Sequence, residues 1–252
     1  MFSQTNLKCS SRKAALFAVL VAMMTSVSPS AEAATNYSAK SFTVEVQGKG
    51  NPVIMIPGLM SDSRVWQQTA SELRKTHQLH LVSIAGFAGQ PAIEGALLPV
   101  VKTELLDYIK SQQLQRPAII GHSLGAFLAY DLASSAPDRI GKIIAVDGLP
   151  FLAPVFTRDS NSSVASMKAQ AEGIRQFYAL MQPAQLAATL QQGMEIQARE
   201  PATRERVQQM GAQSDPKAVG QAIYELLSTD LRDKVANITQ PVLQLGAGGA
   251  AP

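Results

Sequence analysis

The chain has 252 residues, of which 46% are hydrophobic and 16% charged, a composition that excludes an intrinsically disordered protein. Its formal net charge is +3, but the first 33 residues hold three basic residues and one acidic residue, which leaves 19 basic against 18 acidic residues in the remainder. This nearly neutral remainder gives no electrostatic reason to expect nucleic acid or an anionic membrane as a partner.

The N-terminus, residues 1–33, has the three parts of a secretory signal peptide. Three basic residues precede an apolar stretch, Ala14 to Met24, which is too short to span a bilayer, and Ala31-Glu32-Ala33 matches a cleavage site. We therefore expect export to the periplasm or the medium, with a mature chain that begins at Ala34. The alternative is an uncleaved membrane anchor. No later stretch is long and apolar enough to suggest a transmembrane helix.

The only cysteine, Cys9, lies inside this signal, so the mature chain can form no disulfide and no cysteine metal site. No other metal-ligand cluster is present in the sequence, and the Gly-rich stretch 246–249 lacks the third glycine, the helix and the downstream acid of a dinucleotide fingerprint. We expect neither a metal nor a cofactor.

From residue 42 onward, predicted strands and helices alternate, which indicates a parallel sheet with helices on its faces. Residues 42–46 alternate between apolar and polar, whereas the later strands are continuous apolar runs typical of strands buried on both faces. The predicted strands are 42–46, 53–56, 79–84, 118–120 and 140–146, and the predicted helices are 64–76, 97–111 and 124–135.

Residues 151–228 contain no strand pattern and read as a helical insertion. Helices are predicted to begin at Pro183, Pro201 and Pro216, because proline is favoured at the first helical position. Asp215 is expected to cap the last of these helices. A strand pattern returns at 241–245.

The strongest chemical signal is Gly121-His122-Ser123-Leu124-Gly125, which lies between a predicted buried strand and a helix. This context favours a nucleophile elbow, a sharp turn that exposes a strained serine and tolerates only small residues two positions before and after it. The Leu124 amide would then lie at a helix N-terminus, where it can stabilise an oxyanion. The alternative is an ordinary turn between a strand and a helix.

With the buried strand that ends at Pro57-Gly58-Leu59, this elbow makes residues 42–246 resemble the α/β-hydrolase superfamily. The resemblance is supported by the segments 135–147 and 229–242, which look like the family's connections into its next strands. It implies an α/β-hydrolase fold, with a mostly parallel sheet flanked by helices. The core would begin in residues 34–150, a helical cap would occupy 151–228, and residues 229–252 would return to an incomplete core.

The resemblance also implies an oxyanion hole. Proline stands at position 57, where the family usually has histidine, but Gly58 is retained and Leu59 keeps the amide that would face the oxyanion. Together with Leu124, Leu59 is therefore expected to supply the two donors.

A catalytic histidine is not found where the family places it. The family order is serine, acid, histidine, yet the only histidines are His77, His80 and His122, all before Ser123. Strand alternation predicts that His122 points away from the nucleophile as a packed residue. His77 and His80 are expected to be solvated loop residues far from the elbow.

The carboxylate that would orient a catalytic histidine is not found at the family's usual position either. No carboxylate follows Asp233, so Asp147, at the end of the preceding predicted strand, is the candidate acid; its alternative role is to order the loop before Pro150. Asp62 is expected to cap the helix that follows it, with a place at the mouth of the site as the alternative.

We therefore expect a serine hydrolase that acts on a small acyl ester through an acyl-Ser123 intermediate. The simplest explanation for the missing histidine is a chain that lacks its C-terminal part, including the last strand and helix, and is inactive or impaired. Acyl transfer to an alcohol is a related reaction, and a ligand-binding protein without catalysis is the alternative function. The sequence does not indicate an oligomeric state.

Overall fold

The computed structural model describes residues 38–191 and 200–246. The chain divides into two units, Met1–Ala33 and Ala34–Pro252, and every described residue belongs to the second unit. The predicted signal peptide and most of the Gly-rich stretch at 246–249 lie outside the described residues. Among the helices that are described, none is both long and apolar enough to cross a membrane.

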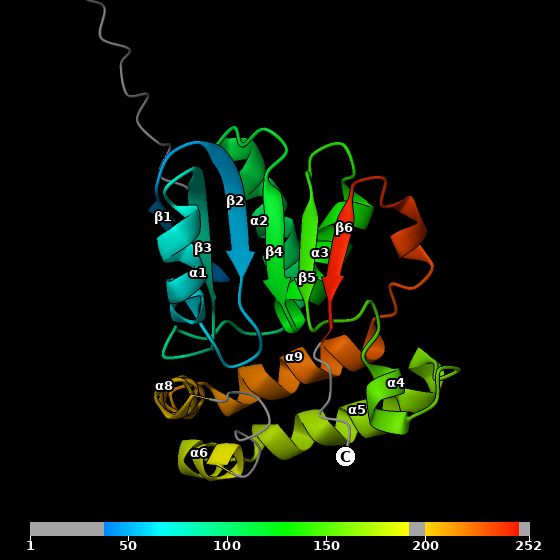
Figure 1. The fold of residues 1–252 in the computed structure, drawn as a ribbon. Coiled ribbons are helices and arrows are strands. Elements are labelled where there is room, and N and C mark those ends of the chain that lie inside the picture. The colour runs from blue at the N-terminus through cyan, green and yellow to red at the C-terminus, as the bar shows by residue number, and fades with distance from the viewer. Residues whose placement is uncertain (1–37, 192–199, 247–252) are drawn as a thin grey trace, which may run out of the picture. The chain divides into compact units, whose positions relative to one another are not determined.

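The described strands form one sheet of six strands in the order β1-β3-β2-β4-β5-β6 (Figure 1). β1 is antiparallel to β3, and all the other neighbours are parallel. The sheet therefore has the mostly parallel arrangement expected from the sequence. The strands are β1 (Phe42–Gln47), β2 (Asn51–Ile56), β3 (His77–Ile84), β4 (Ala118–His122), β5 (Ile143–Val146) and β6 (Val242–Leu245).

Strand β5 begins later than predicted. β5 starts at Ile143, whereas the apolar pattern predicted a strand from residue 140. Ile140 is fully buried, but it lies in the hydrophobic core ahead of the strand rather than in a pair with β4. Apolar patterning reports burial and does not distinguish it from sheet pairing, which explains the difference.

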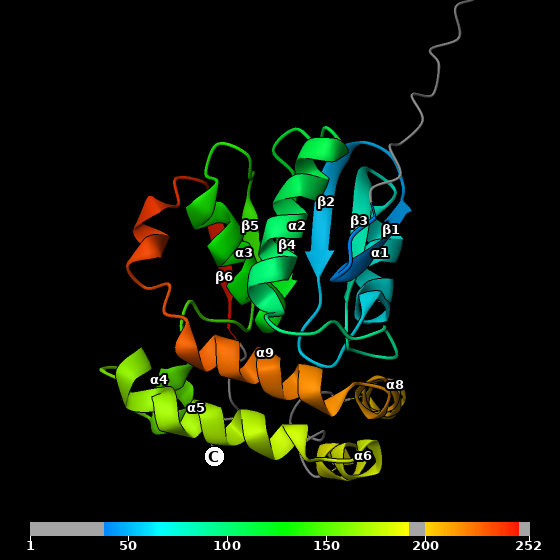
Figure 2. The ribbon, with the colours of Figure 1, turned by 180° about the vertical axis from the view of Figure 1, so that it is seen from behind.

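Helices cover both faces of the sheet. α1 (Gln67–Leu73) lies on one face, and α2 (Leu98–Ser111) and α3 (Leu124–Ser135) lie on the other (Figures 1 and 2). The single helix predicted over 64–76 is wrong in its extent: a short 3-10 turn, η1 (Ser63–Trp66), precedes α1, which ends at Leu73. The chain after Leu73 tightens into turns, with Thr76 N–H donating to Leu73 C=O over 3.1 Å, and then enters β3.

The described parts of 151–228 are helical, as predicted. The helices are α4 (Ala153–Thr157), α5 (Val164–Ala179), α6 (Pro183–Gln191), α8 (Pro201–Ala212) and α9 (Pro216–Ser228), and a 3-10 turn, η2 (Lys234–Asn237), follows. Three of them begin at the predicted prolines, and Asp215 caps α9 by accepting the Ala218 amide over 2.9 Å. α9 and α5 lie side by side past the carboxyl ends of the strands (Figures 1 and 2).

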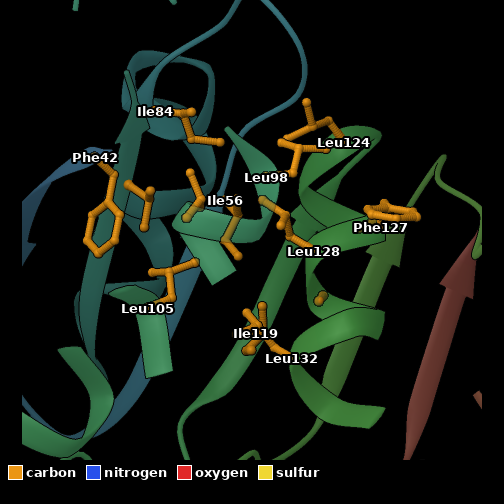
Figure 3. Close-up of a cluster of buried hydrophobic side chains, with 14 of the residues drawn as sticks. Phe42, Ile56, Ile84, Leu98, Leu105, Ile119, Leu124, Phe127, Leu128 and Leu132 are labelled. Carbon is orange, nitrogen blue, oxygen red and sulfur yellow. The ribbon is translucent and has the colours of Figure 1, made fainter. Parts of the chain in front are cut away.

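Two hydrophobic clusters hold the sheet between its helices. The larger one fills the space between the sheet and α2 and α3 (Figure 3) and continues into α9 through Ala218, Val219 and Leu226. The smaller one packs Trp66 and Ala70 against the opposite face of β2, β3 and β4. Beyond α1 this second face becomes exposed, and Leu243 and Leu245 of β6 keep 52% and 46% of their surface.

Candidate active site

Ser123 occupies a strained turn between β4 and α3. Its backbone has φ +51° and ψ −113°, a conformation that residues with a side chain rarely adopt. The turn is fixed on both sides: Ser123 N–H donates to Val146 C=O in β5 over 2.8 Å, and its own carbonyl accepts the Ala126 amide over 2.9 Å. This is the backbone geometry expected of a nucleophile elbow.

The glycines of the elbow are required by contact distances. A Cβ built on Gly121 would lie 2.2 Å from Gly125 C=O, and one built on Gly125 would lie 2.2 Å from Ile56 C=O. Both distances are far inside van der Waals contact, and the obstacles are backbone atoms that cannot rotate away. The predicted steric reason for small residues at these two positions is therefore confirmed.

A third glycine at the elbow was not identified from the sequence. A Cβ on Gly148 would lie 2.4 Å from Ala126 Cβ and 2.6 Å from Ser123 C=O, so the loop after β5 closes directly onto the serine. The only sequence signal was a glycine immediately after Asp147. Three connections, after β2, β4 and β5, thus meet around Ser123.

The predicted oxyanion loop lies against the serine. The position of a Cβ on Gly58 is 3.4 Å from Ser123 Cβ, which places the backbone that leads to Leu59 beside the nucleophile. The loop folds back sharply here, with Met60 at φ +59° and Ser61 N–H donating to Gly58 C=O over 3.3 Å. Leu124 is the first residue of α3, where amides have no partner within the helix. Leu59 thus follows a residue that lies beside Ser123, and Leu124 is the residue after Ser123 in the chain.

His122 is the last residue of β4, and its side chain is partly buried. Burial lowers the pKa of its imidazole, and the negative charge of Asp147 opposes this shift in part. The ring also borders the predicted oxyanion loop, since the Cβ position of Gly58 is only 2.8 Å from His122 Nδ1. Strand alternation alone did not indicate this contact.

Asp147 follows β5 at the same end of the sheet as Ser123. Its backbone has φ +48°, its side chain is exposed, and its N–H donates to Leu245 C=O in β6 over 2.7 Å. The carboxylate thus lies close enough to influence His122. Asp62, in contrast, is occupied as the cap of η1: it accepts the Arg64 amide over 3.0 Å and forms a 2.8 Å ion pair with the same residue.

The other two histidines lie away from the elbow, in β3. His77 opens the strand, with its Nδ1 2.8 Å from Thr76 Oγ1. The prediction that both are loop residues is wrong, because both belong to β3. His80 is not solvated either, since it is 2% exposed and bonds the Tyr108 hydroxyl over 2.7 Å. Burial lowers the pKa of His80 to about 4 and raises that of Tyr108 to about 12. The pair is a neutral hydrogen bond between the sheet and α2.

Buried side chains of the helical segment 151–228 pack against one another. Phe151 is 2% exposed and lies with Met167 and Leu227 in a cluster within the helical segment 151–228.

A cavity of about 650 Å³ lies between the loop 92–97 and helices α5 and α9, and its lining includes Leu97 and Arg175 but not Ser123. No group of three or more potential metal-ligating side chains occurs within the described part of the chain.

A strained serine between a parallel strand and a helix, with the loop after β2 beside it, is the arrangement typical of the elbow in the alpha/beta-hydrolase fold. The comparisons agree: the model of the alpha/beta hydrolase family matches residues 53–246. The chain belongs to the alpha/beta hydrolase family.

Its relatives include esterases. The chain is 25% identical over 209 residues to the pimeloyl-[acyl-carrier protein] methyl ester esterase of Vibrio vulnificus (strain YJ016), covering 80% of this chain and 76% of the relative. It is 31% identical over 203 residues to the biotin biosynthesis bifunctional protein BioHC of Cellvibrio japonicus, covering 77% of this chain and 37% of that protein. Among solved structures, a thermophilic esterase from Thermogutta terrifontis matches with a TM-score of 0.68 and 20% identity over 81% of this chain and 73% of the esterase.

Proposed function

We propose that this chain is an exported serine hydrolase that acts on a carboxylic ester, or a similar acyl substrate, through an acyl-Ser123 intermediate. The observation that carries the proposal is the strained backbone of Ser123, at φ +51° and ψ −113°. The turn around it has no room for a side chain at Gly121 or Gly125. Such strain persists only where the surrounding structure imposes it, and it clusters at functional sites.

The reaction follows from the positions of these groups. Ser123 Oγ attacks the ester carbonyl carbon, loses its proton to a base, and leaves an oxyanion that the Leu59 and Leu124 amides stabilise. Collapse of this intermediate expels the alcohol, which takes up a proton, and leaves an acyl-Ser123 ester. Attack by water then releases the acid and restores the serine. Attack by a second alcohol instead would give acyl transfer.

No histidine of this chain is assigned as the base that accepts the Ser123 proton. No histidine follows Ser123 in the 252 residues, His77 and His80 lie in β3, and His122 packs against Gly58. Asp147 remains the candidate acid because of its place beside the elbow. Loss of the histidine in a triad protease cost about 10⁶ in turnover, so we expect severely impaired hydrolysis by the 252-residue chain.

The relatives support the ester class. The matched relative from Vibrio vulnificus is named as a methyl ester esterase, and we propose a small acyl ester as the substrate here as well. Export is proposed from the charged region, apolar stretch and cleavage pattern of residues 1–33. Mass spectrometry of the protein recovered from a secreting bacterial host should give a chain that begins at Ala34; recovery of the intact N-terminus would refute cleavage there.

A ligand-binding protein without catalysis is the alternative function, and the strained backbone of Ser123 counts against it, because a protein that only binds needs no strained serine. Turnover of p-nitrophenyl butyrate by the native chain and by Ser123→Ala separates the two. A rate that is lower in Ser123→Ala supports a hydrolase. Equal rates in the two proteins would leave the binding function as the better description.

A further inference from the structure

Gly58 has no room for a side chain because His122 occupies the space. A Cβ built on Gly58 would lie 2.8 Å from His122 Nδ1 and 3.2 Å from His122 Cε1. The same point is 3.4 Å from Ser123 Cβ. The edge of the imidazole ring is therefore in contact with the backbone of the predicted oxyanion loop, directly beside the nucleophile.

The backbone that carries this ring is fixed. His122 pairs with Val146 in the parallel ladder between β4 and β5, and the next residue, Ser123, donates its N–H to the carbonyl of the same Val146 over 2.8 Å. The sheet therefore fixes the backbone from which the ring projects toward Gly58. On its other side the loop is anchored by Leu59 and Met60, which pack against the larger hydrophobic cluster, so Gly58 lies between that cluster and the imidazole.

The charge of the imidazole also matters for its role beside the loop. Burial lowers the pKa of His122, so the imidazole is neutral at pH 7 and presents a flat surface with one donor and one acceptor nitrogen. A neutral support leaves the stabilisation of a developing oxyanion to the backbone amides.

We propose that His122 is a positioning residue whose imidazole supports Gly58 and thereby sets the distance between the Leu59 amide and the carbonyl oxygen of a substrate at Ser123. The inference rests on the proposed function and adds a role for the histidine of the elbow. His122 makes and breaks no bond in it. Its effect is confined to the stability of the tetrahedral state.

A trifluoromethyl ketone measures this effect without the need for turnover. Ser123 Oγ forms a bond to the carbonyl carbon of octyl trifluoromethyl ketone, the C=O π pair moves onto oxygen, and the serine proton passes to solvent. Fluorine NMR gives the affinity of this adduct. Dividing it by the affinity for octyl methyl ketone, which resists addition, removes the contribution of alkyl-chain binding.

A double-mutant cycle then tests the contact. His122→Ala removes the support and Gly58→Ala pushes the loop outward, so each should lower the affinity ratio about tenfold, a fraction of the ~10²–10³ lost with a whole oxyanion donor. The double variant should recover most of the ratio, because the added methyl group fills the space left by the ring. His122→Asn should also retain it, since its amide can replace Nδ1. Gly173→Ala is the matched control, because a Cβ there meets nothing within 4 Å.

The outcomes separate the two hypotheses. A Ser123-dependent adduct that is unchanged in His122→Ala and Gly58→Ala, or additive losses in the double variant, would overturn the positioning role and leave the hydrolase proposal standing. No Ser123-dependent adduct in the native chain would overturn both. Thermal denaturation checks that each variant is folded, and His122→Ser replaces His122→Ala if the latter is not.

Discussion

The buried carboxylate of Glu225 ties α9 to the core, and its removal should be among the most damaging single changes in the chain. Glu225 is 6% exposed and accepts the Leu97 and Leu98 amides over 2.9 and 2.7 Å. These amides stand at the N-terminus of α2, where no partner exists within the helix. Gln221 Nε2 donates a third bond over 2.7 Å.

Replacing Glu225 with alanine would leave these donors without their acceptor in a buried place. A stranded buried donor costs about 1–3 kcal/mol, and hydrogen bonds to a charged group contribute about 1.5–3 kcal/mol. We therefore expect Glu225→Ala to lower the free energy of unfolding by about 3–5 kcal/mol. Glu225→Gln, which keeps one acceptor oxygen, should cost about 1–2 kcal/mol.

Urea denaturation followed by circular dichroism measures both values, and Glu205→Ala on the exposed face of α8 is the control, expected within about 0.5 kcal/mol of the native chain. Hydrogen exchange should become faster at the Leu97 and Leu98 amides in Glu225→Ala. A loss below about 1 kcal/mol, with unchanged exchange at these amides, would refute this reasoning.

Three further predictions follow from burial and contact. The pKa of His80 is about 4 in the folded chain and 6.5 for an ordinary histidine, so the unfolded chain binds more protons between these two pH values. The free energy of unfolding should therefore fall by about 3 kcal/mol as the pH drops from 6.5 to 4. Denaturation at a series of pH values should show a weaker dependence of this free energy on pH in His80→Gln than in the native chain. Gly125→Ala, whose methyl group would lie 2.2 Å from Ile56 C=O, should abolish the cooperative thermal transition, and a native-like transition would contradict the contact. Leu243→Lys on the half-exposed edge strand β6 should reduce light scattering from self-associated protein at unchanged melting temperature, whereas equal scattering would show that this edge does not drive association.

Much of the fold could be predicted because its signals are local. A buried strand, a proline that opens a helix, and the spacing of Gly121, Ser123 and Gly125 each extend over a few residues. The capping role of Asp215 was visible for the same reason, since its partner is the third residue after it. Where a residue and its partner are close in the chain, a short sequence pattern contains both, and their interaction can be predicted.

The errors and omissions depend on distant partners. Glu225 accepts a hydrogen bond from an amide 128 residues before it, and His80 forms a hydrogen bond with a tyrosine 28 residues after it. The sequence around each of these residues therefore did not reveal that its side chain is buried. The start of β5 depends on where its neighbours pair. The contact of His122 with Gly58 likewise joins two separate turns that meet only in the folded sheet.

The strain at Ser123 gives a test of the site that is independent of any base or substrate. At φ +51° a serine or alanine is strained, whereas glycine reaches this region without cost. Ser123→Gly should therefore be more stable than Ser123→Ala by about 1–2 kcal/mol. The opposite order is expected in a regular helix: at Ser71 of α1, glycine should be less stable than alanine by about 1 kcal/mol. If glycine is the less stable choice at both positions, the elbow is not strained and the main support for a nucleophile at Ser123 is lost. If the order reverses only at Ser123, the fold holds this serine in an unfavourable conformation whether or not a base is present.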